Sequence, residues 1–177
     1  SMMNKGLEVI EARWLFDLLP EKIEVIIHPQ SIIHSMVHFS DGSVKAQMGV
    51  PDMRVPILYS LSYPDRLASD LPKLDLSQCG ALSFVPPDTK RFRNLALAYH
   101  ALNEGGNMPC ILNAANEVAV SAFLAGKIGF LQMSDVVEHT MEKTEYFASP
   151  GLRYLETTNS LARTEAQNYI NELCKRS

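Results

Sequence analysis

The sequence predicts an α+β fold that ends in a bundle of four helices. Apolar residues recur at helical spacing from residue 88 onward, with breaks at glycines. Two short apolar runs flank the dipeptide Asp41-Gly42, which suits a tight hairpin turn. Between them and the helices, residues 63–87 are rich in proline and show no regular period. We therefore expect a mixed part at 1–62, an extended linker at 63–87 and a helical bundle domain at 88–177.

The mixed part at 1–62 is expected to contain a helix, a strand and a hairpin, in that order. Pro20 ends the helix, whose apolar face consists of Leu7, Ile10, Trp14, Leu15 and Leu18. Residues 23–27 form a short β-branched run that is typical of a buried strand. Residues 34–39 and 44–48 would then pair across Asp41-Gly42.

Four amphipathic helices account for the rest of the chain. The first carries an apolar stripe over 92–102 and ends at Gly105-Gly106. The second spans 110–124, and Ser134 is a suitable N-cap for the third. The fourth is expected to begin at Asn159 or Ser160. Short turns between such helices favour a bundle.

Composition excludes several classes of protein. The chain has 177 residues, of which 46% are apolar and 20% charged, so it is expected to fold rather than to be disordered. Its formal net charge is −4, without a basic stripe, which argues against a nucleic-acid partner. No apolar run is long enough to span a bilayer, so no membrane association is expected. Three scattered cysteines fit a reduced, cytoplasmic protein.

The first candidate site lies at the start of the first helix. Asn4 precedes the helical pattern and is a possible cap, while Lys5 and Glu8 share one helix face. Helix-start N–H groups beside an amide and an ammonium suit a phosphate, and Gly6 would allow a ligand close to the backbone. Glu8 would offer one oxygen to a hard cation such as Mg²⁺. From spacing alone, a solvated Lys–Glu ion pair is the favoured alternative.

Three histidines form a second candidate cluster. His28, His34 and His38 lie close together in the sequence, a density that raises the hypothesis of a transition-metal site. Neither a HExxH pattern nor a cysteine pair accompanies them, so hydrogen-bonded strand histidines are the favoured interpretation. Ser31, which lies among them, has no GxSxG context for a hydrolase.

The third candidate is the run Leu112-Asn113-Ala114-Ala115-Asn116-Glu117. Its two asparagines lie one helical turn apart on a predicted helix, separated by alanines. Small residues permit close helix packing, and the amides are then expected to satisfy nearby backbone groups. We therefore interpret this run as structural.

Five segments considered together resemble one enzyme family. They are residues 2–16, 27–37, 41–44, 51–54 and 112–117. Their order and spacing resemble the 1-deoxy-D-xylulose 5-phosphate (DXP) reductoisomerase family of non-mevalonate isoprenoid biosynthesis. The resemblance extends over nearly the whole chain and is most specific in the mixed part at 1–62.

The resemblance implies an activity and a set of site residues. Members of the family rearrange DXP and reduce the product with NADPH, giving 2-C-methyl-D-erythritol 4-phosphate. They require Mg²⁺ or Mn²⁺ and are homodimers. Carried onto this chain, Asn4 and Lys5 would bind substrate and Glu8 would be a metal ligand. His34 would line the site with Ser31 and Met53, and the catalytic set would be Lys5, Glu8 and His34.

The chain departs from the family pattern in what it lacks. It contains no GxGxxG dinucleotide fingerprint, and the family's other acidic metal ligands lie upstream of the segments matched here. The mixed part at 1–62 would then be the closing part of an α/β catalytic and dimerisation domain. We expect the chain alone to be inactive. The alternative from another class is a non-enzymatic helical dimerisation or interaction module.

Overall fold

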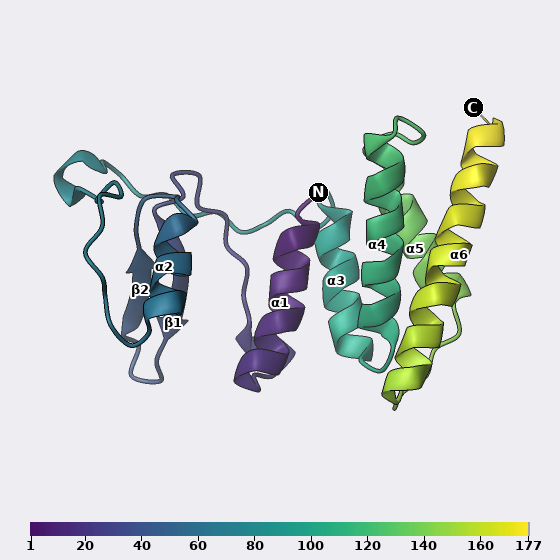
Figure 1. Ribbon diagram of the computed structural model, residues 1–177, viewed down its shortest axis with the longest axis horizontal. Coiled ribbons are helices and arrows are strands. Elements are labelled where there is room, and N and C mark those ends of the chain that lie inside the picture. The colour runs from purple at the N-terminus through teal and green to yellow at the C-terminus, as the bar shows by residue number, and fades with distance from the viewer. Residues whose placement is uncertain (177) are drawn as a thin grey trace. The chain divides into compact units, whose positions relative to one another are not determined.

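The computed structural model of the chain describes residues 1–176. They form an α+β structure of helices and one two-stranded sheet, as the sequence predicts (Figure 1). Two compact units make up the chain: residues 1–25 together with the chain from residue 87 onward, and residues 26–86. None of the helices within residues 1–176 is long and apolar enough to cross a membrane.

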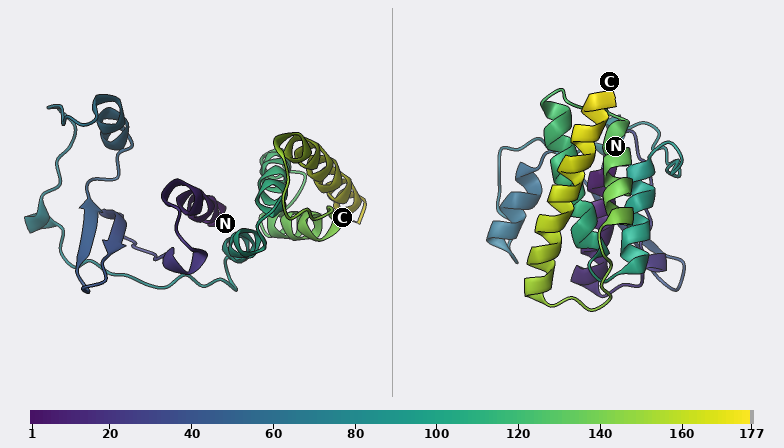
Figure 2. Two further views of the ribbon diagram at one scale, coloured as in Figure 1. Left: turned by 90° about the horizontal axis from the view of Figure 1, so that it is seen from below. Right: turned by 90° about the vertical axis from the view of Figure 1, so that its right-hand side faces the viewer.

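The first unit is helical. Here α4 lies between α3 and α6 (Figures 1 and 2), and it packs against α5 as well. Leu95, Ile111 and Ile170 are fully buried in its core, as are alanines that let the helices approach closely. The elements of this unit are α1 (Met3–Phe16), a 3₁₀ turn η1 (Pro20–Lys22), α3 (Arg93–Glu104), α4 (Met108–Leu124), α5 (Gln132–Lys143) and α6 (Leu152–Arg176).

The second unit is a hairpin with a short helix. Strands β1 (Ile33–His38) and β2 (Val44–Met48) are antiparallel, with Val37 opposite Lys45. Gly42 in the turn has φ 85°, a conformation that glycine adopts without strain. Helix α2 (Arg54–Ser62) and the turn η2 (Leu76–Gln78) follow. No residue from 26 to 86, all of which the structure describes, is buried, so this unit has no core of its own.

Several predicted elements are confirmed and others are wrong. The hairpin, the irregular stretch and the four C-terminal helices are present. The strand predicted at 23–27 is wrong, since only Ile27 makes a bridge, to Val85. Helix α2 was not predicted, because its apolar residues give no amphipathic period. Ser134 lies inside α5 rather than at its cap, and α6 begins at Leu152, ahead of the predicted Asn159 or Ser160.

The compact units have different bounds from the predicted domains 1–62, 63–87 and 88–177. Helix α1 belongs with the bundle, because it packs against α3. Those predicted domains refer to a complete enzyme and stay a prediction; the units describe how this chain packs.

Gly6 is the point at which α1 and α3 meet. A Cβ atom at Gly6 would lie 2.4 Å from the Cβ of Ala98, far inside van der Waals contact. The interpretation of Gly6 as an opening for a ligand is therefore wrong: the missing side chain makes room for α3.

Gly6→Ala is expected to destabilise the helical unit by about 1–3 kcal/mol, because the two helices must move apart. This loss outweighs the gain in helix propensity of about 1 kcal/mol. Thermal unfolding followed by circular dichroism at α-helical wavelengths measures it. Glu11→Ala, an exposed change on the same helix, is the control. An unchanged melting temperature for Gly6→Ala would contradict the close packing of α1 on α3.

Candidate functional site

Asn4, Lys5 and Glu8 lie together on the first turns of α1. The ammonium of Lys5 is 2.8 Å from Glu8 Oε2, and both side chains are about half exposed, at 47% and 56%. The ion pair expected from spacing is thus present. Such an exposed pair contributes little to stability, about 0–1 kcal/mol.

The start of α1 has backbone N–H groups without partners inside the helix. The helix begins at Met3, and its first intrahelical bond runs from the Gly6 N–H to the Met2 carbonyl, 3.1 Å. The N-cap residue Met2 makes no side-chain cap, and the Met3 N–H donates to Ser1 Oγ at 3.4 Å. The prediction that Asn4 caps this end is wrong, because Asn4 lies within the first turn. The backbone N–H groups of Asn4 and Lys5 precede that first bond and therefore have no carbonyl partner inside the helix. The Lys5 ammonium is paired with Glu8 one turn along α1. Unpaired N–H groups at a helix start are a general anion-binding feature.

Ser31, His34 and Met53 belong to the second unit. Ser31 closes a turn through its N–H, which donates to the His28 carbonyl at 3.0 Å, and has φ 52°. His34 is an exposed residue of β1, and its Nε2 lies 3.8 Å from where a Cβ on Gly49 would be. Met53 immediately precedes α2 and is 71% exposed. All three are accessible on the hairpin unit.

The histidine cluster does not form a metal centre in the part of the chain that the structure describes. No group of three or more His, Cys, Asp or Glu side chains there could hold an ion. His28 instead donates from Nδ1 to the Ser83 carbonyl, 2.9 Å, and its ring stacks on Phe84 with centroids 4.8 Å apart. The predicted hydrogen bond is confirmed for His28, but this residue lies outside the strands β1 and β2, so its assignment to a strand is wrong.

Asp52 and Arg54 are polar residues of a family segment to which the sequence pattern assigned no role. Arg54 Nη2 donates to Asp52 Oδ2 at 2.6 Å, and Arg54 Nε donates to both carboxylate oxygens. The pair brackets Met53 at the start of α2. The side-chain bond from Arg54, with a second from its backbone N–H, lowers the pKa of Asp52 to about 2.

Arg54→Met is expected to raise the pKa of Asp52 from about 2 toward its ordinary value of 3.8. Part of the depression should remain, because the backbone N–H of residue 54 still donates to Asp52. Since the folded pKa is lowered, the pair's contribution to stability is present above pH 3.8 and is lost as the pH falls toward 2. Carboxyl chemical shifts followed by NMR measure the titration. Arg66→Met, which removes another arginine of the same unit, should leave Asp52 unchanged.

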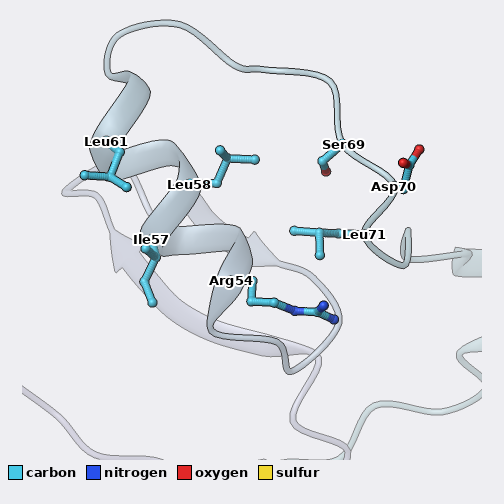
Figure 3. Close-up of a pocket in the computed structure, with 7 residues that line it drawn as sticks. All are labelled: Arg54, Ile57, Leu58, Leu61, Ser69, Asp70 and Leu71. Carbon is cyan, nitrogen blue, oxygen red and sulfur yellow. The ribbon is translucent and has the colours of Figure 1, made fainter.

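A shallow pocket of about 470 Å³ lies beside α2 (Figure 3). Arg54, Ile57, Leu58 and Leu61 line it from the helix, and the segment 69–71 forms the opposite wall. The lining is mainly apolar, and of the sequence candidates none contributes to it. It is an open surface of the hairpin unit rather than an enclosed binding site.

The run 112–117 lies on α4 and forms a polar link to α6. Asn113 Nδ2 donates to Glu117 at 3.1 Å, Glu117 pairs with Arg163, and Arg163 Nε donates to Asn159 at 2.7 Å. The hydrogen bond from Arg163 lowers the pKa of Glu117. Ala114 and Ala115 are fully buried in the core. The interpretation of close helix packing is confirmed by the buried alanines. The expectation that the amides bond backbone groups is wrong for Asn113, which bonds the Glu117 carboxylate.

Comparison with known proteins decides the family. Residues 48–165 match the model of the DXP reductoisomerase C-terminal domain. The chain belongs to the DXP reductoisomerase family. The resemblance inferred from the five sequence segments is therefore confirmed.

The chain is similar to curated DXP reductoisomerases over nearly its whole length. The enzyme of Bacteroides thetaiotaomicron is 61% identical over 170 residues, which are 96% of this chain and 44% of that protein. The enzyme of Bacteroides fragilis is 59% identical over the same shares. The chain thus spans less than half the length of the curated relatives that it matches.

Solved structures of DXP reductoisomerases share the fold. The Zymomonas mobilis enzyme in complex with NADPH superposes with a TM-score of 0.88 at 45% identity, covering 96% of this chain and 45% of that one. A reductoisomerase in complex with NADPH, fosmidomycin and magnesium gives a TM-score of 0.91 at 42% identity, covering 97% and 44%. These complexes associate the family with NADPH and magnesium.

Proposed function

We propose that this chain is the C-terminal part of an enzyme that converts DXP to 2-C-methyl-D-erythritol 4-phosphate with NADPH. The observation that carries the proposal is the 61% identity to a DXP reductoisomerase over 96% of the chain. The same observation argues against the alternative of an unrelated dimerisation or interaction module. We place the complete protein in the cytoplasm as a homodimer.

The chain's residues bind and orient the substrate in this proposal. Lys5 and the open N–H groups at the start of α1 hold the phosphate or an adjoining hydroxyl, assisted by the amide of Asn4. His34, Ser31 and Met53 of the hairpin unit are proposed, from the family resemblance, to contact the substrate in the complete enzyme. In this proposal the side chains help to orient the carbon skeleton.

Glu8 fits a divalent cation only in part. It supplies one half-exposed carboxylate, whereas Mg²⁺ requires about six oxygens in near-octahedral geometry. The described residues provide no cluster that would complete the shell. We therefore assign Glu8 as one ligand of Mg²⁺ or Mn²⁺, with the remaining ligands outside this chain. When bound, the cation would polarise the substrate's oxygens.

The test measures NADPH oxidation with DXP and Mg²⁺ for two proteins. One is this chain alone. The other is a chimera that joins the amino-terminal portion of the Bacteroides thetaiotaomicron enzyme to this chain. We expect turnover from the chimera and none above the blank from the chain alone. An inactive but folded chimera would contradict the proposed function, and turnover by the isolated chain would contradict the need for the additional part.

A further inference from the structure

The segment 83–85 is held against the segment 27–30 by backbone hydrogen bonds. The Ile27 N–H donates to the Val85 carbonyl at 2.9 Å, and the Val85 N–H donates to the Ile27 carbonyl at 2.9 Å. The end of the irregular stretch predicted as a linker therefore returns to the turn that precedes β1. Ile27 and Val85 are thus adjacent in space although they lie far apart in sequence.

Side chains from both segments extend this contact. Gln30 Nε2 donates to Ser83 Oγ at 2.8 Å, and the Ser83 N–H donates to Gln30 Oε1 at 3.3 Å. His28 Nδ1 donates to the Ser83 carbonyl, and the His28 ring stacks on Phe84 at an interplanar angle of 18°. We name Gln30, Ser83, His28 and Phe84 the turn clamp.

Ser31 lies directly after the turn clamp in a left-handed conformation. Its φ of 52° is uncommon for a residue with a side chain, and such a residue persists where its surroundings hold it in place. The turn clamp holds the chain on one side of Ser31. On the other side the Gly49 N–H donates to the Ile32 carbonyl at 2.9 Å, at the base of the hairpin. Ser31 is thus fixed between two tethers, and His34 follows shortly after it on β1.

We propose that Gln30 is a positioning residue which, through the turn clamp, sets the orientation of Ser31 and His34 for substrate binding. This inference rests on the proposed function, in which those two side chains line the site. The side chain of Gln30 bonds Ser83, and Gln30 immediately precedes Ser31 in the chain. Gln30 therefore acts on Ser31 through the backbone of the turn. Small displacements of binding groups reduce catalytic efficiency by up to about 10²-fold.

The test uses the active chimera and separates KM from kcat. Gln30→Ala should raise the KM for DXP about tenfold, the effect of losing the ordering that a hydrogen bond supplies, with kcat within about twofold. Gln30→Glu should keep the KM close to that of the unsubstituted chimera, because the N–H and hydroxyl of Ser83 can both donate to a carboxylate. The matched control is Gln47→Ala, an exposed glutamine of β2 whose side chain bonds only its neighbour's carbonyl, 3.3 Å.

Variants of Phe84 test the turn clamp independently. Phe84→Ala removes the ring stacked on His28 and should raise the KM, whereas Phe84→Tyr keeps the ring and should not. The proposal would be overturned by unchanged KM values for both alanine variants, or by a KM for Gln30→Glu as high as that for Gln30→Ala. Failure of the unsubstituted chimera would count against the proposed function instead. The two failures are therefore distinguishable.

Discussion

Glu8→Gln in the chimera is expected to lower kcat/KM by about 10³-fold or more. The change removes the carboxylate charge that we propose to bind the metal ion, while it keeps the size of the side chain. A bound metal ion stabilises the charge of the transition state by several kcal/mol, and a loss of about 1.4 kcal/mol slows the reaction roughly tenfold. The concentration of Mg²⁺ required for half-maximal activity should also rise, which steady-state kinetics at varied Mg²⁺ measures.

The control for Glu8→Gln lies one turn along the same helix. Glu11→Gln removes an exposed carboxylate of α1 and should retain activity within about threefold, since surface substitutions of this kind usually change stability by less than about 0.5 kcal/mol. Because the Lys5–Glu8 pair is exposed, Glu8→Gln should leave the melting temperature almost unchanged. If Glu8→Gln lowered activity by less than tenfold, its assignment as a metal ligand would be wrong.

The sequence predicts the local structure of this chain correctly where a single strong signal, such as a turn dipeptide or a pair of glycines, is present. The Asp41-Gly42 turn specifies the hairpin, and the glycines after residue 104 end α3 as predicted. The run 23–27 was misread because its β-branched residues fit a strand by composition, although only Ile27 finds a backbone partner. Helix α2 has apolar residues on more than one side, so its period gave no signal.

The packing roles of single residues were less predictable. Gly6 was interpreted as a place for a ligand, and only the position of Ala98 shows that a helix occupies that space. The turn clamp depends on contacts between distant parts of the sequence, which the spacing of neighbouring residues does not predict. The candidate residues Asn4, Lys5 and Glu8 were found together because they lie on one helix turn. Ser31, His34 and Met53 came from the family resemblance, and the structure shows them to be accessible.

Asn107 is the buried polar residue whose loss should cost the helical unit most. It is fully buried, and its Nδ2 donates to the Glu145 carbonyl at 2.9 Å and to Thr158 Oγ1 at 3.3 Å. Its Oδ1 accepts from the Phe147 N–H at 2.8 Å. One side chain therefore joins the start of α4 to the loop before α6 and to α6 itself.

Asn107→Ala should destabilise the unit by about 3 kcal/mol, because it removes three hydrogen bonds of a fully buried amide, each of which contributes about 0.5–1.5 kcal/mol. For a chain of this size the melting temperature should fall by about 6–12 °C, measured by circular dichroism. The control Asn103→Ala changes an exposed asparagine of α3 and should shift it by less than about 2 °C. Equal melting temperatures for the two variants would mean that the loop before α6 is held by its apolar contacts rather than by Asn107.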